Sequence, residues 1–198
     1  MATASQSPPE AGSAPRVIKL QAIPLTREAF APFGEVVEPA EDGVAFGAED
    51  AALDLTQGTP RVYIMRLRDR PLGFDRITHH ARVTQCLGAV GGQPWFLGVA
   101  PPSLVQGDGG DDDDEGVPRG AAGQRYRPPE PGAVRVFVME GAVVVKLHAG
   151  TWHAGPLFAQ PCMDFFNLEL QDTNVVDHTT HNFAQSDGAV FEIEDAHS

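Results

Sequence analysis

Short runs of apolar, β-branched and aromatic residues recur along the chain from residue 60 onwards, with glycine or proline between them. Runs of this composition are typical of strands, and the glycines and prolines mark the turns that join them. With 21 Gly and 17 Pro in 198 residues, the pattern predicts an antiparallel sandwich or barrel. The predicted strands are RVYIMRL (61–67), ITHHARVTQ (77–85), PWFLGVA (94–100), VRVFVM (134–139), AVVVKLH (142–148), DFFNLEL (164–170) and AVFEI (189–193).

A tail, a helix and an insertion accompany this β-rich body. Residues 1–16 are small, polar and proline-bearing, which predicts a disordered lead-in to one domain over residues 17–198. A domain of that length can bury a core of its own. In LTREAFAPFGEVV, Thr26 is the candidate N-cap of one short helix that the following proline and glycine end. Residues 103–133 contain GDGGDDDDEG, whose repelling charges predict a flexible, acidic insertion.

The net charge of −13 argues against nucleic acid and anionic membrane surfaces as partners. No stretch approaches the roughly 18 consecutive apolar residues of a membrane helix, and the first residues lack the apolar core of a signal peptide. Cys86 and Cys162 both lie in apolar segments, a usage that suits a reducing compartment. We therefore expect a cytoplasmic protein, although the serines and alanines of the N-terminus leave organellar targeting open.

Only Glu140 and Gly141 separate VRVFVM from AVVVKLH, which predicts a two-residue β-hairpin loop. Side chains alternate along a strand, so Lys146 and His148 share one face with Val144, while the opposite face carries Val143, Val145 and Leu147. The polar face points either to solvent or into a polar cavity, and alternation does not decide between the two.

Histidines cluster in two further segments. His79 and His80 are adjacent, so they face opposite sides of a regular strand and only one of them can enter a barrel. Gln85 lies an odd number of positions after His80, so this pair converges only across a bulge or turn. In DHTTH (177–181), two histidines stand three apart beside an aspartate, and we assign both a structural or loop role.

One set of polar residues could bind a small anion and move a proton, because imidazole titrates near neutrality and ligates metals while lysine offers a fixed positive charge. Its members are His80, Gln85, Lys146, His148 and His153. No Ser–His–Asp pattern, phosphate loop or cysteine-based zinc spacing in the sequence competes with it. The residues alone therefore indicate a β-rich domain with a candidate histidine-lined pocket.

Four segments resemble the ureidoglycolate lyase family, called ureidoglycolate hydrolase in older naming. They are LTREAFAPFGEVV, HARVTQCLGAVGGQPWFLGVAPP, VFVMEGAVVVKLHAGTWHAGPLF and DFFNLELQDTNVVDHTTH, and the similarity extends over residues 17–183. The Gly-x-Trp-His-x-x-Pro-Leu core at residues 150–157 is its most specific part, followed by the spacing of His80 and Gln85. The acidic insertion and the ending DHTTHNF look closer to plant and green-algal members.

This resemblance implies an all-β, cupin-like double-stranded β-helix, or jelly-roll barrel, with a short N-terminal helix. It also implies a homodimer that acts in allantoin and purine breakdown, releasing urea from ureidoglycolate and leaving glyoxylate. In cupins the strand around the first histidine motif bends, which would bring His80 and Gln85 together despite their spacing.

Roles for individual residues follow as hypotheses from the resemblance and the reaction. His153 or His148 would take the hydroxyl proton of the substrate, and Lys146 would serve as the acid or hold the carboxylate. Trp152 would form a wall of the pocket.

Two further residues are assigned to substrate binding. The family often has an arginine where this chain has Leu170, so Arg82 is the predicted substitute for holding the substrate carboxylate. Gln85 is the second predicted substrate-binding residue.

A divalent metal is an alternative means of acidifying the hydroxyl, because the α-hydroxy-carboxylate could chelate it. Its predicted ligands are His80, Gln85, His148 and His153, a set compatible with nickel, manganese, iron or zinc, and a site without metal stays open. Two other functions also stay open: a metal-dependent cupin dioxygenase or isomerase, and a cupin that binds a small molecule without turnover.

Overall fold

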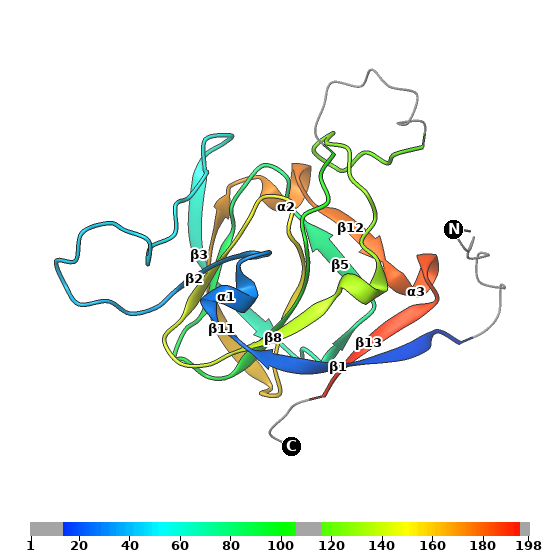
Figure 1. Cartoon of the computed structure of the whole chain (residues 1–198), viewed down its shortest axis with the longest axis horizontal. Coiled ribbons are helices and arrows are strands. Elements are labelled where there is room, and N and C mark those ends of the chain that lie inside the picture. The colour runs from blue at the N-terminus through cyan, green and yellow to red at the C-terminus, as the bar shows by residue number, and fades with distance from the viewer. Residues whose placement is uncertain (1–13, 106–115, 195–198) are drawn as a thin grey trace.

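The computed structural model describes residues 14–105 and 116–194, which form two curved sheets with little helix (Figure 1). The eight-stranded sheet has the order β12-β5-β10-β7-β8-β1-β13-β4, and the five-stranded sheet has the order β2-β9-β6-β11-β3. The strands are β1 (Arg16–Pro24), β2 (Gly34–Val37), β3 (Pro60–Arg68), β4 (Gly73–Phe74), β5 (Arg76–His79), β6 (Cys86–Ala89), β7 (Trp95–Ala100), β8 (Arg135–Met139), β9 (Val144–Leu147), β10 (Trp152–Leu157), β11 (Cys162–Leu170), β12 (Thr179–Asn182) and β13 (Ala189–Glu194). The helices are α1 (Arg27–Phe30), α2 (Thr173–Val176), α3 (Phe183–Ser186) and the 3₁₀ helix η2 (Pro131–Ala133).

The cupin-like β-barrel predicted from the sequence is confirmed, with one departure from a purely antiparallel arrangement. β1 runs parallel to β13 through its first residues and parallel to β8 through its last three. Every other pair of named strands in the described residues is antiparallel. Because β1 joins β8 to β13, the larger sheet continues past the barrel wall and curls around it (Figure 1).

The main hydrophobic core lies between the two sheets. Trp95 and Phe165 meet there from opposite sheets, with ring centroids 5.2 Å apart. The predicted short helix is confirmed as α1, whose N-cap Thr26 accepts a hydrogen bond from the backbone N–H of Ala29 at 3.1 Å. This cap directs the fully buried Phe30 into the core.

A second core covers the outside of the larger sheet. Trp152, Phe183 and Phe191 are buried there, under the curl made by β1, β13 and β4. Gly98 of β7 permits this packing, since a Cβ at that position would lie 2.6 Å from the ring of Phe74. Strands β7 and β10 are thus covered on both faces, and His79 at the end of β5 is buried as well, whereas Arg76 at the start of β5 is exposed.

The predicted hairpin between residues 134 and 148 is wrong. β8 belongs to the larger sheet and β9 to the smaller one, so the chain crosses between sheets and does not fold back on itself. Gly141 does adopt a positive φ of 75° in this crossing. The predicted alternation holds within β9, because Val145 and Leu147 lie in the core and Lys146 lies on the opposite face.

The ends of the predicted insertion pack against the body, whereas most of its acidic run lies outside the described residues. The backbone N–H of Ala121 donates to Thr179 Oγ1 at 2.8 Å, and the Tyr126 ring lies 5.5 Å from that of Trp152. Most of the predicted N-terminal tail also lies outside the described residues, although Arg16, its last member, begins β1.

In residues 14–105 and 116–194, no helix has the length and apolar composition needed to cross a bilayer.

Candidate active site

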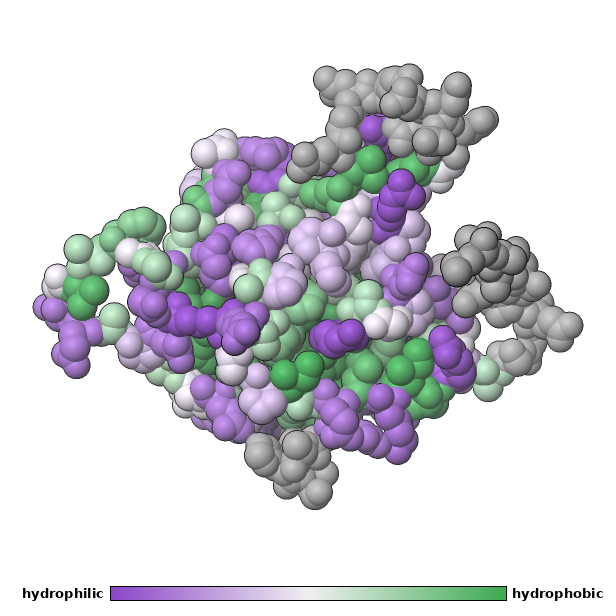
Figure 2. All heavy atoms as spheres, in the orientation of Figure 1, coloured by the Kyte–Doolittle hydropathy of each residue, from purple (hydrophilic) through white to green (hydrophobic). Residues whose placement is uncertain are grey.

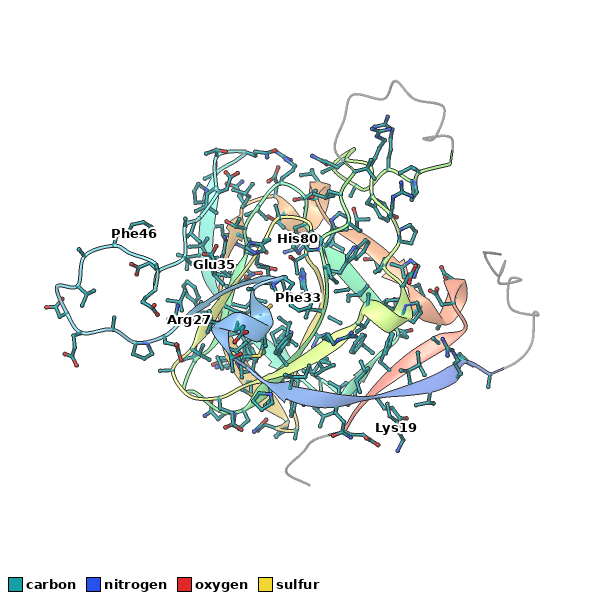
Figure 3. All side chains as sticks on the ribbon, viewed as in Figure 1. Lys19, Arg27, Phe33, Glu35, Phe46 and His80 are labelled. Atoms are coloured by element: carbon teal, nitrogen blue, oxygen red, sulfur yellow. The ribbon has the colours of Figure 1, made fainter. Side chains whose placement is uncertain are left out.

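His80 and His153 come together on the barrel side of the larger sheet. His153 in β10 pairs directly with Val99 of β7 and with Thr78 of β5, and Val99 belongs to the main core. Directly opposed residues share a face, so His153 points into the barrel. His80 follows β5 in phase with Thr78, and its ring centroid lies 5.1 Å from that of His153. Figure 3 shows His80 within the ring of strands, whereas Lys19 and Phe46 lie at the periphery.

A bend between β5 and β6 makes this meeting possible. The predicted strand over residues 77–85 ends at His79, and the Asp177 carboxylate accepts hydrogen bonds from the backbone N–H groups of Ala81 and Arg82, both at 2.8 Å. The bend removes the difficulty of the odd spacing between His80 and Gln85, as the resemblance to cupins implied.

The hydrogen bonds of the two imidazoles indicate where their protons lie. A carbonyl oxygen can only accept, so His80 Nδ1–H donates to Asp177 O at 2.5 Å, and His153 Nδ1–H makes a weaker bond to Thr151 O at 3.3 Å. In each neutral ring, Nε2 therefore carries the free lone pair and is the atom able to accept a proton.

Burial favours the neutral form of both rings. It lowers the pKa of His153 to about 3, with the nearby charge of His80 adding to the effect. Burial also lowers the pKa of His80, although the hydrogen bond to Asp177 O opposes this change. The exposed His178 completes the cluster, with its ring centroid 5.5 Å from that of His80.

Gln85 points into the same barrel interior, where side chains of β11 hold it by hydrogen bonds. Its Nε2 donates to Asn167 Oδ1 at 3.1 Å and to Glu169 Oε2 at 3.2 Å. The other oxygen of Glu169 accepts from the Tyr63 hydroxyl at 3.2 Å and from Asn174 Nδ2 at 3.0 Å. The network fixes the amide orientation of Gln85. It also interacts electrostatically with the histidine cluster, because Glu169 is among the charges that act on His80.

The Oε1 atom of Gln85 is buried and has no hydrogen-bond partner in the described residues. An unsatisfied buried carbonyl oxygen costs about 1–3 kcal/mol. Gln85 is bonded to Glu169, whose charge acts on His80, and an unsatisfied atom in this network favours a binding site for a ligand with N–H groups over a purely structural role.

Lys146 and His148 do not join this cluster. Lys146 faces away from the core with Nζ 2.8 Å from Glu35 Oε1, and His148 Nε2 lies 3.2 Å from the carbonyl oxygen of Ala31. The histidine charges that act on His153 are those of His79, His80 and His178, and neither Lys146 nor His148 is among them.

Arg82 and Trp152 also lie apart from the two imidazoles. The Arg82 guanidinium donates to Gln57 O at 2.7 Å and lies 3.9 Å from Asp172 Oδ2. Trp152 points into the outer core, where its Nε1–H donates to Ser103 Oγ at 2.8 Å. It packs against His79 rather than beside His153.

The predicted metal ligands are not brought to one point, because His148 stands at the end of α1 while His80 and His153 stand inside the barrel. In residues 14–105 and 116–194, no group of three or more His, Cys, Asp or Glu side chains has the geometry to hold a metal ion. The predicted ligands therefore do not fit a metal centre, and the proposed reaction uses no metal.

Three residues of the site were not singled out from the sequence: Tyr63, Asn167 and Glu169. His178, which was assigned a structural or loop role, also lies against His80. The period of two in DFFNLEL carries a usable signal for two of the three. Asn167 and Glu169 share the face of the fully buried Phe165, and polar side chains on a buried face need partners.

Comparison with known proteins identifies the family of the chain that carries this site. The family model described as ureidoglycolate lyase matches residues 17–187, nearly the whole described body. The chain belongs to the ureidoglycolate lyase family. The resemblance stated from the sequence is thereby confirmed.

Bacterial members of the family are similar over most of their length. The ureidoglycolate lyase of Pseudomonas syringae pv. syringae is 27% identical over 182 residues, covering 85% of this chain and 92% of that protein. The ureidoglycolate lyase of Agrobacterium fabrum is 27% identical over 165 residues, covering 74% and 81%. That of Pseudomonas aeruginosa is 25% identical over 166 residues, covering 78% and 83%.

Proposed function

We propose that this chain is a ureidoglycolate lyase, which splits ureidoglycolate into urea and glyoxylate in allantoin and purine catabolism. The observation that carries the proposal, beside family membership, is the pair of neutral imidazoles of His80 and His153 inside the barrel. The names of the relatives favour this activity over a metal-dependent dioxygenase or a cupin without turnover.

Ureidoglycolate is a carbinolamide, in which one carbon carries a carboxylate, a hydroxyl group and a urea nitrogen. In the elimination, His153 Nε2 takes the hydroxyl proton, a carbonyl forms, and the electrons of the breaking C–N bond go to the urea nitrogen. That nitrogen must gain one proton, which the His153 imidazolium can return. One imidazole with a free Nε2 is therefore enough to balance the reaction, and such a base typically gives about 10²- to 10⁴-fold acceleration.

Substrate binding also changes the basicity of His153. Its pKa of about 3 describes the site without an anion. A bound carboxylate favours the charged imidazolium and raises the pKa of His153 toward neutrality, where a general base works best. The buried ring is thus a weak base until its anionic substrate is present.

Gln85 supplies recognition of the urea group. Its Oε1 is unpartnered and buried, and its Nε2 is held by Asn167 and Glu169. The oxygen can accept one N–H of the urea group, while the network keeps the amide from rotating.

We further propose a cytoplasmic homodimer that binds this small substrate and neither nucleic acid nor membranes. Large apolar side chains stand exposed without a partner in the described chain, among them Phe46 (77%), Val62 (62%) and Ile64 (58%). Phe46 lies on the loop that projects from the barrel, where apolar atoms are visible in Figure 2. Light scattering after gel filtration would test the dimer, and a monomeric mass at micromolar concentration would contradict it.

Product analysis tests the activity directly. Purified protein given ureidoglycolate should release urea and glyoxylate in equal amounts without ammonia, because elimination leaves the urea group intact. Stoichiometric ammonia would indicate amidohydrolase chemistry, and saturable binding without product would indicate a non-catalytic cupin.

A further inference from the structure

A substrate with a fixed carboxylate needs a cationic group where it binds. A buried carboxylate without a positive partner is strongly disfavoured, so a site of this kind requires an arginine or lysine within hydrogen-bond reach. Lys146 is engaged by Glu35 on the outer side of the small sheet, and Arg82 is engaged by Gln57 and Asp172.

Arg61 stands where such a cation is needed. β3 pairs with β11 in a register that sets Arg61 opposite Glu169 and Tyr63 opposite Asn167. Opposed residues share a face, so Arg61 lies on the same side of the small sheet as the network that holds Gln85.

The Arg61 guanidinium is held in place, but its hydrogen-bond donors are not used in the part of the chain that the structure describes. Its Cζ lies 3.8 Å from the centroid of the Tyr63 ring, and its Nη1 lies 3.9 Å from Glu169 Oε1, too far for a hydrogen bond. Its side chain is 45% exposed, and within the described residues its N–H groups make no hydrogen bond. Glu169 meanwhile accepts hydrogen bonds from Tyr63, Asn174 and Gln85, so its charge is already stabilised by neutral donors.

We propose that Arg61 is the residue that binds the substrate carboxylate, with two parallel N–H···O bonds from a guanidinium that the Tyr63 ring orients. This inference rests on the proposed lyase function and assigns a role that Arg82 and Lys146 were predicted to fill. Planar bidentate pairing with a carboxylate is the geometry for which arginine is suited and lysine is not.

The arrangement also explains how the protein could bind all three substituents of the central substrate carbon. Arg61 and Gln85 both adjoin Glu169, one from β3 and the other from the bend before β6. The carboxylate at Arg61 and the urea group at Gln85 leave the hydroxyl group directed to the imidazoles. Such three-point contact distinguishes the two mirror-image forms of the substrate carbon.

The test compares Arg61→Met with Arg66→Met, a matched control on the same strand whose guanidinium pairs with Asp164 on the opposite face. Arg61→Met should raise the KM for ureidoglycolate about 10- to 100-fold, the scale of a lost charge-assisted pair, with a smaller change in kcat. Arg66→Met should leave both constants within about threefold. Arg61→Lys should recover only part of the loss, because lysine cannot reproduce the planar pair.

Two ligands separate carboxylate binding from a general loss of structure. Oxalurate is a stable ureide with a carboxylate, and calorimetry should show its Kd rising at least tenfold in Arg61→Met. N-(hydroxymethyl)urea lacks the carboxylate, and as a competitor of ureidoglycolate it should have the same inhibition constant in both proteins. Equal weakening of both ligands would show that Arg61 acts on the fold, and equal oxalurate affinity in both proteins would also overturn the inference.

The calorimetric experiment needs no turnover, so failure of the two proposals can be told apart. A wild-type protein that binds oxalurate through Arg61 but releases no urea would contradict the lyase function and support the carboxylate site. If the wild-type protein releases urea and Arg61→Met has the same KM and the same affinity for oxalurate, the lyase function is supported and the carboxylate site is contradicted. A wild-type protein that does not bind oxalurate would overturn the carboxylate site.

Discussion

His79 and His80 are neighbours in the chain, both are buried, and they end in opposite kinds of environment. His79 points into the outer core, where its ring lies 4.3 Å from that of Trp152 and neither ring nitrogen has a hydrogen-bond partner in the described residues. His80 points into the barrel, where its Nδ1–H is held by Asp177 O and its ring faces His153.

The comparison shows that burial of a histidine does not by itself indicate function. Burial lowers the pKa of both rings, that of His79 to about 4. Only His80 has an anchored proton, a free Nε2 and a second imidazole within reach. Anchoring sets the tautomer and the direction of the lone pair, and proton transfer depends on both.

The largest expected effect is a loss of activity on replacing a histidine that faces the barrel. His153→Asn should lower kcat for ureidoglycolate by about 100-fold or more, because the general base is lost while a polar side chain of similar size remains. The steady-state rate, normalised to folded protein by circular dichroism, measures this. A variant that keeps its rate per folded molecule but loses stability would make His153 a structural histidine.

A second prediction concerns acid stability. The folded pKa values of His79 and His153, about 4 and about 3, lie below the ordinary value of 6.5, so the unfolded state binds more protons between those limits. Stability should be full above pH 6.5 and fall as the pH drops toward 4, by up to about 1.4 kcal/mol per pH unit for each histidine.

His79→Leu isolates one share of this acid dependence. Urea unfolding between pH 7 and 4.5 should show a shallower loss of stability in the variant, with kcat within about threefold of wild type at pH 7. An unchanged slope would mean that the His79 ring is solvated, and a large loss of kcat would place it in the site.

Much of this architecture could be predicted from the sequence, because period-two alternation and turn residues are local signals. The strands, the Thr26 cap and the opposite orientations of His79 and His80 all follow from residues within a few positions of one another. The wrong hairpin at Glu140 and Gly141 shows the limit. Loop length permits a hairpin, but β8 and β9 each pair with other strands, and only the tertiary fold decides this.

The site was harder to predict for the same reason. Alternation put Lys146 and His148 in one phase but could not say which face of β9 lines the barrel. Asn167 and Glu169 look unremarkable until their strand is seen to bring them beside Gln85. Contacts between distant segments leave little trace in a single sequence.

The smallest expected effect lies outside the barrel, at the ion pair of Lys146 and Glu35. Lys146→Met keeps the length and apolar stem of the side chain and leaves Glu35 partly exposed to solvent. Turnover should change by less than about threefold, because an exposed partner makes the pair worth little. A loss as large as that expected for His153→Asn would restore Lys146 to the predicted role of acid or carboxylate clamp.

The most direct test of the central claim is a ring-nitrogen NMR titration of the seven histidines, assigned with single variants, with and without oxalurate. At pH 7.5 the His80 and His153 rings should be neutral and protonated on Nδ1, as their carbonyl contacts require. Oxalurate should shift the Nε2 resonances of these two residues and leave those of His79 unchanged. Shifts confined to His79 or His148, or a doubly protonated His153 at pH 6 without ligand, would contradict the account.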